Sequence, residues 1–150
     1  MDEIHGRATI TTPTAADSVF DGVIDLDRLT DWNRAIERVD QRPDVLAAGT
    51  TWTVTMHPPG MPRWGSESKV VELDRSARRF RYTTRNTDGN PSWAEWEWRV
   101  TPTAAGTQVE VSWDVYLRTR DRRWLAGPLR KRQLAREVPR SLQSLAATLA

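Results

Sequence analysis

Few side chains in this sequence have the types and spacing that acid–base chemistry needs. The two histidines, His5 and His57, are too few to form a metal cluster alone. His57 follows a predicted strand over residues 50–56 and leads into a loop, residues 57–62, that is rich in proline and glycine. A histidine at the rim of a pocket can act as a general acid or base, so His57 is one catalytic candidate. The alternative is an exposed loop histidine with no chemical role.

The tyrosines are the other candidates, because a phenol can donate a hydrogen bond to a ligand carbonyl. Tyr82 falls on the apolar side of its predicted strand and Tyr116 on the polar side of its own, which makes Tyr82 the second catalytic candidate. Ordinary packing is the alternative for both. The sequence holds no cysteine, no Gly-rich phosphate loop and no G-x-S-x-G turn. We therefore expect no metal site and no cofactor.

The spacing of apolar residues changes along the chain, and it predicts the strands and helices that must position these candidates. Alternating apolar residues predict strands, and apolar residues at steps of three and four predict a long helix near the C-terminus. The predicted order is a strand at 4–12, a short helix opening at 14–17, a second short helical segment at 25–33, strands at 36–42, 50–56, 64–73, 78–85, 93–101 and 107–117, and a helix over 121–149. Hairpin-length loops join the last five strands, so we expect an antiparallel sheet.

Two local irregularities are also predicted. Val70 and Val71 are adjacent and both apolar, which breaks the alternation and indicates a β-bulge. Pro139 lies inside the predicted long helix, where it removes a backbone hydrogen bond, so we expect a kink near residues 135–139.

Sorting each strand by its alternation gathers the aromatic residues on one face of the sheet. Small polar residues such as Ser66 and Ser68 interrupt that face, as in pockets that orient a ligand with a few hydrogen bonds. The predicted ligand-binding wall consists of Trp52, Val54, Met56, Trp64, Ser66, Ser68, Phe80, Tyr82, Trp96, Trp98 and Trp113 on the sheet, closed by Leu134, Val138 and Leu142 on the helix. The alternative is that these aromatic residues simply fill the core.

The length of 150 residues suits one domain, residues 1–150, which can bury a core without disulfides. The N-terminal residues lack the basic start and apolar run of a signal peptide, and no apolar stretch is long enough to span a bilayer. With the absence of cysteine, this favours a cytoplasmic protein. The sequence does not indicate an oligomeric state.

Positive charge is concentrated in residues 118–140, which hold nine basic and two acidic side chains. Such a stretch could contact nucleic-acid phosphates or an anionic membrane. However, the aromatic residues that would stack on bases are predicted to face inward, apart from Trp93 and Trp124. The sequence therefore favours a solvated helix face over a nucleic-acid partner, and it leaves an anionic ligand or membrane surface open.

Several short motifs occur in an order that resembles a known superfamily. They are PTAADSVF at 13–20, LTDWN at 29–33, GTTW at 49–52, VVELD to RRFRY at 70–82 and WEWRVTP at 96–102. This order is similar to the START-like (SRPBCC) superfamily, in particular the bacterial polyketide cyclase/dehydrase and lipid-transport family, over nearly the whole chain. The resemblance implies an α+β helix-grip fold, in which a curved seven-stranded antiparallel sheet, two short helices and a long C-terminal helix enclose an apolar cavity. Members of that family are diverse in activity and share no universal catalytic motif.

Three functions remain open at this point. The first is a carrier or binding protein for a hydrophobic small molecule of aromatic or polyketide-like character. The second is a polyketide cyclase, aromatase or dehydratase that works in the same cavity, mainly by orienting a reactive chain. The third is an interaction module that uses the basic stretch.

Overall fold

One antiparallel sheet organises the computed structural model, which describes residues 3–118 and 127–149. Within these residues the sheet has seven strands in the order β1-β7-β6-β5-β4-β3-β2. The strands are β1 (Glu3–Thr12), β2 (Ile36–Gln41), β3 (Thr51–Met56), β4 (Trp64–Asp74), β5 (Arg79–Asn86), β6 (Trp93–Thr103) and β7 (Gly106–Tyr116). The helices are α1 (Ala16–Ile24), the short 3₁₀ helix η1 (Leu26–Arg28), α2 (Leu29–Trp32) and α3 (Gly127–Leu149). The predicted order of elements and the α+β helix-grip fold are confirmed.

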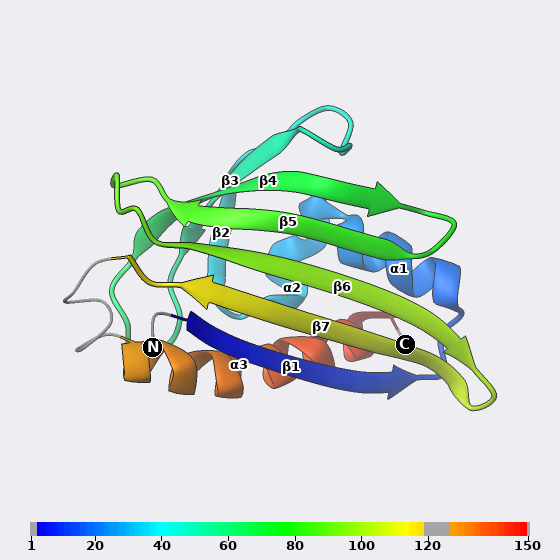
Figure 1. Cartoon of the computed structure of the whole chain (residues 1–150). Helices are drawn as coiled ribbons and strands as arrows, with labels where there is room; N and C mark the ends of the chain where they lie inside the picture. The colour runs from blue at the N-terminus through cyan, green and yellow to red at the C-terminus, as the bar shows by residue number, and fades with distance from the viewer. Residues whose placement is uncertain (1–2, 119–126, 150) are drawn as a thin grey trace.

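The strands curve around the helices (Figure 1). Strands β2 to β7 form a meander, whereas β1 returns from the other end of the sequence to pair with β7, with Ile4 opposite Val115. α3 packs along β1 and also contacts α1 and α2. The three helices therefore cover one face of the sheet and leave the other face exposed to water.

Alternation along the strands divides the two faces as predicted. On β7, Val109, Val111, Trp113 and Val115 are all buried, because successive side chains of a strand point to opposite faces. The opposite face carries charged pairs between neighbouring strands. Arg81 donates to Glu95 at 2.7 Å and Arg85 donates to Glu67 at 3.0 Å. Pairs across a sheet of this kind each contribute about 0.2–1 kcal/mol.

The predicted β-bulge is present in β4. The pairing of β4 with β5 shifts between Val70 and Glu72, so Val71 falls outside the regular register. Val70 is buried at 2% exposure while Val71 is 45% exposed. The extra residue lets β4 bend and keeps Val70 on the covered face.

α3 presents Leu134, Val138, Leu142 and Leu145 to the sheet, and all four are buried. Pro139 lies within this helix, which the structure assigns as helical throughout from Gly127 to Leu149. Proline removes the hydrogen bond to the carbonyl four residues earlier, which belongs to Ala135. Ala135 is exposed, so water can take the place of the missing donor. The predicted start of the helix at residue 121 lies outside the described residues.

The 3₁₀ helix η1 has a side-chain cap at its N-terminus, whereas α1 and α2 begin after Ala15 and Arg28 without one. The Asp25 side chain accepts a hydrogen bond from the backbone N–H of Asp27 at 3.1 Å and so caps η1. The next helix, α2, is only four residues long, yet it brings Trp32 into the core at 3% exposure.

Candidate functional site

A cavity of about 120 Å³ lies between α3, the short helices and strands β3 to β6. Twelve of the fourteen predicted binding residues line it: Trp52, Val54, Met56, Trp64, Ser66, Ser68, Phe80, Tyr82, Trp96, Trp98, Leu134 and Val138. Further lining residues include Val23, Leu26, Leu29, Trp32, Asn33, Thr84, Asn86, Arg130, Gln133, Glu137 and Ser141. Most of the wall is therefore aromatic or aliphatic, with polar groups contributed mainly by α3 and by the β4–β5 pair.

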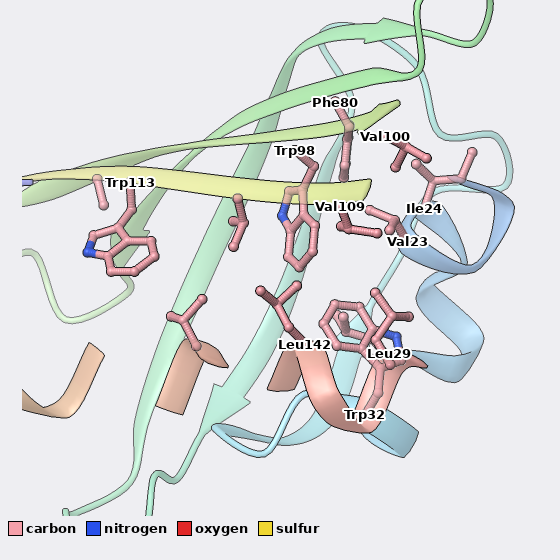
Figure 2. Packing of buried hydrophobic residues seen from close by; sticks show 14 of the residues in the cluster. Val23, Ile24, Leu29, Trp32, Phe80, Trp98, Val100, Val109, Trp113 and Leu142 are labelled. Carbon is pink, nitrogen blue, oxygen red and sulfur yellow. The ribbon is translucent and has the colours of Figure 1, made fainter. Parts of the chain in front are cut away.

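The aromatic wall is built from edge and face contacts between neighbouring rings. Trp52 stacks on Phe80 with a centroid separation of 6.0 Å and meets Tyr82 edge-on at 5.0 Å. Trp98 meets Trp32 edge-on at 5.5 Å, so a ring from α2 closes the wall opposite the sheet (Figure 2). Such contacts fix the ring positions and leave flat apolar surfaces facing the cavity.

Trp113 and Leu142 are buried but do not line the cavity. Figure 2 shows Trp113 well apart from the pair formed by Trp32 and Trp98. The Trp113 ring lies instead against Gly6 of β1, where a Cβ atom would come within 2.2 Å of it, and against Trp96 at 5.6 Å. Gly6 is thus needed because its missing side chain makes room for this indole. Trp113 and Leu142 therefore act in packing. The spacing of apolar residues in the sequence places both on the covered face, but it does not distinguish packing residues from residues that line the cavity.

Tyr82 lies in the cavity wall, and its hydroxyl accepts a hydrogen bond from Trp98 Nε1 at 3.3 Å. Accepting this bond leaves the phenol hydrogen available for a ligand. Burial raises the pKa of Tyr82 to about 12, and the hydrogen bond from Trp98 offsets this only in part. At neutral pH Tyr82 is therefore a neutral donor, suited to a ligand carbonyl and unsuited to act as a base.

Replacing Tyr82 by phenylalanine is expected to change how stability depends on alkaline pH. Because the pKa of Tyr82 is raised in the folded state, the unfolded chain ionises first, and the wild type loses stability as the pH rises from about 10 towards 12. By pH 11 the wild type should have lost about 1 kcal/mol relative to Tyr82→Phe. Urea unfolding from pH 8 to 11 measures this difference, and parallel curves for the two proteins would contradict it.

His57 is not among the residues that line the cavity. It is 37% exposed at the surface, and its Nδ1 lies 3.5 Å from Oε1 of Glu37 on β2. Glu37 also accepts a hydrogen bond from Arg63 at 2.9 Å, and this bond is the main reason that the pKa of Glu37 is lowered. The structure therefore places His57 in a surface charge cluster, with its backbone N–H bonded to the carbonyl of Ala35.

Two buried polar residues of α3 line the cavity, although the sequence predicted only Leu134, Val138 and Leu142 for this part of the wall. Ser141 is 6% exposed, and its hydroxyl accepts a hydrogen bond from the backbone N–H of Arg34 at 3.3 Å. Glu137 is 8% exposed and lines the cavity. Its Oε2 atom has no hydrogen-bond partner among the residues that the structure describes. Glu137 and Ser141 follow Leu134 by three and seven residues, and this spacing puts both on the buried face of the helix. The spacing is the signal in the sequence that could have identified them.

A second hollow of about 450 Å³ adjoins the cavity and shares Trp64, Thr84, Asn86 and Arg130 with it. The guanidinium of Arg130 on α3 lies over the Trp64 ring of β4, 5.4 Å from its centroid. This cation–π contact joins the helix to the sheet where the two spaces meet. Arg130, which belongs to the basic stretch, therefore lies at the cavity.

The other aromatic residues of interest lie near the end of β7. Trp93 stacks on Tyr116 at 4.3 Å, and Arg118 lies over the Tyr116 ring at 5.6 Å. Neither Trp93 nor Tyr116 lines the cavity, in agreement with their predicted positions on the outer face of the sheet. Trp124 lies outside the described residues.

Among residues 3–118 and 127–149, no group of three or more histidine, cysteine, aspartate or glutamate side chains could hold a metal ion. Within the same part of the chain, no helix is both long and apolar enough to cross a membrane.

Known proteins share this architecture at low sequence identity. The family model described as polyketide cyclase/dehydrase and lipid transport matches residues 3–150. A protein from Chromobacterium violaceum superposes with a TM-score of 0.76 at 18% identity, covering 97% of this chain and 96% of its own. The Zhui aromatase/cyclase from a Streptomyces species has a TM-score of 0.73 at 21% identity, covering 98% and 93%. The di-domain aromatase/cyclase StfQ of the steffimycin pathway has a TM-score of 0.79 at 14% identity, covering 98% of this chain and 50% of its own. Among curated proteins, none matches the sequence significantly.

Proposed function

Because this chain belongs to the polyketide cyclase/dehydrase and lipid transport family, we propose that it binds a hydrophobic, ring-containing small molecule in the cavity between α3 and the sheet. The observation that carries the proposal is the cavity wall. Indole, phenyl and phenol rings from β3, β5, β6 and α2 surround one space, with a few polar groups between them. Cavities that bind small molecules have this combination of apolar walls and sparse orienting groups.

The size of the cavity limits the ligand. An apolar cavity of roughly 150 Å³ is large enough to bind benzene. At about 120 Å³, the present cavity can accept a compact group of about one ring without rearrangement. A larger ligand would have to continue past Trp64 and Arg130 into the adjoining hollow. We therefore propose that a ring of the ligand occupies the cavity, and that any larger part of the ligand lies in the adjoining hollow.

A second candidate function is cyclisation, aromatisation or dehydration of a polyketide-like chain in the same cavity. Two observations favour it: two of the similar structures are aromatase/cyclases, and Tyr82 offers a neutral phenol to the cavity. In such a reaction the wall would fold the chain, while Tyr82 would polarise a carbonyl. Turnover that disappears in Tyr82→Phe, with ligand affinity retained, would distinguish this enzyme from a carrier.

Thermal unfolding in the presence of three small ring compounds tests the binding function. A ligand at 100 times its dissociation constant adds about 2.7 kcal/mol to the free energy of unfolding, so p-xylene, p-cresol and naphthalene should raise the melting temperature. Because tryptophans form much of the wall, the same compounds should also change the intrinsic fluorescence. If none of the three compounds changes either signal, the cavity is not a ligand site and the proposal fails.

A further inference from the structure

The polar atoms that line the cavity are not all paired. Glu137 Oε2 and Trp32 Nε1 are buried and have no hydrogen-bond partner among the described residues. Both residues line the cavity, Glu137 from α3 and Trp32 from α2, and they are 8% and 3% exposed. Buried polar groups in folded proteins are nearly always hydrogen-bonded, so two unpaired groups at one cavity need an explanation.

Glu137 is not required by the packing of α3. Its neighbours Leu134, Val138 and Leu142 already form the buried apolar stripe of the helix, which needs no carboxyl group at position 137. A buried carboxyl oxygen without a partner destabilises the folded protein, because its lost hydration is not replaced. Such a residue is typical of a site where a ligand supplies the missing partner.

The other residues of the cavity wall limit which chemical group can pair with Glu137. Arg130, the cation among the lining residues, lies over Trp64 and donates to Gln133, on the side where the two hollows meet. The remaining wall around Glu137 is aromatic, aliphatic or neutral and polar. A carboxylate oxygen needs a donor and the Trp32 N–H needs an acceptor. A hydroxyl group does both, whereas a hydrocarbon does neither.

We propose that Glu137 is the polar anchor of this cavity, and that the ligand is a ring compound with a hydroxyl group that donates to the Glu137 carboxylate. Trp32 Nε1 donates a hydrogen bond to the oxygen of a ligand of this class. This inference rests on the proposed binding function and adds the chemistry that selects the ligand. Glu137 thereby becomes a specificity residue, and the aromatic wall supplies the affinity.

Binding of p-cresol and p-xylene tests the proposal, because the two probes differ only by a hydroxyl in place of a methyl group. Titration calorimetry gives the ratio of their association constants in wild type, Glu137→Met and Glu137→Gln. The ratio should fall about tenfold in Glu137→Met, which keeps the length and removes the acceptor. Glu137→Gln keeps an acceptor oxygen and should retain most of the preference for p-cresol.

The outcomes separate this inference from the function on which it rests. If neither probe binds to wild type, the binding function fails. If both probes bind and Glu137→Met leaves their ratio unchanged, Glu137 is not the anchor and the inference is overturned. Urea unfolding gives an independent measure without ligand. Glu137→Met should be at least as stable as the wild type, and a clear loss of stability would show that the carboxylate is already paired.

Discussion

Replacement of Leu142 by alanine is expected to lower the free energy of unfolding by about 3 kcal/mol. Leu142 is 1% exposed and belongs to the core cluster that joins α3 to the sheet. Figure 2 shows it reaching from the helix towards the sheet, in the region of Trp98. Truncation removes buried methyl groups and leaves a void that the surrounding rings, held by their mutual contacts, can fill only in part. Urea unfolding measures the loss.

The same helix provides a matched control. Leu129 is 63% exposed, so Leu129→Ala should change the free energy of unfolding by less than about 0.5 kcal/mol. An equal effect of the two substitutions would mean that α3 does not dock through the face that carries Leu142. Because this docking forms one wall of the cavity, that result would also undermine the binding site.

Replacement of Ser68 by leucine is expected to weaken binding of ring compounds at least about 100-fold while the protein stays folded. Ser68 is 3% exposed, lines the cavity and lies on β4 opposite Trp52 and Thr84. A leucine here would occupy much of the space of about 120 Å³ that a ligand ring needs. The added apolar surface is buried against the aromatic wall, so stability should be kept or increased. Calorimetric titration with p-xylene measures the loss of affinity.

Lys69→Leu is the control for this substitution. Lys69 is the next residue of the same strand, is exposed and points to the opposite face of the sheet. It introduces the same side chain without entering the cavity, so p-xylene should bind as it does to wild type. Affinity lost equally in both variants would locate the binding of p-xylene somewhere other than this cavity.

The sequence predicted the fold well because local patterns determine most of it. Alternation on β7 and the bulge at Val70 and Val71 depend only on neighbouring residues, and both are as predicted. The motif order also identified the family, and this identification is confirmed by the match over residues 3–150. In each of these cases the information lies within a short window of the chain.

The site was less predictable from the sequence, because the depth at which a side chain is buried and the residues that it contacts depend on distant segments of the chain. Alternation placed Trp98 and Trp113 on the same face, but only the pairing of β1 with β7 brings Gly6 under Trp113 and removes that ring from the cavity. Likewise, His57 lies beside Glu37 because β2 pairs with β3. These pairings join residues that are far apart in sequence, so no local pattern reports them.

Glu137 and Trp32 were missed for a different reason. The apolar residues of α3 predict one buried stripe of the helix, and a glutamate within a basic stretch is typical of a solvated position. Glu137 is nevertheless buried, because α3 packs against β1, α2 and α1. Trp32 belongs to a helical segment of four residues, too short for a periodic signal.

Native mass spectrometry of the protein purified from its own host tests the central claim most directly, because it weighs the chain together with whatever it holds. The account predicts that the wild type carries a small molecule, that the released compound contains a ring with a hydroxyl group, and that Ser68→Leu carries none. A wild-type protein with the mass of the bare polypeptide, or a bound molecule that Ser68→Leu retains equally, would contradict the claim that the cavity between α3 and the sheet is a ligand site.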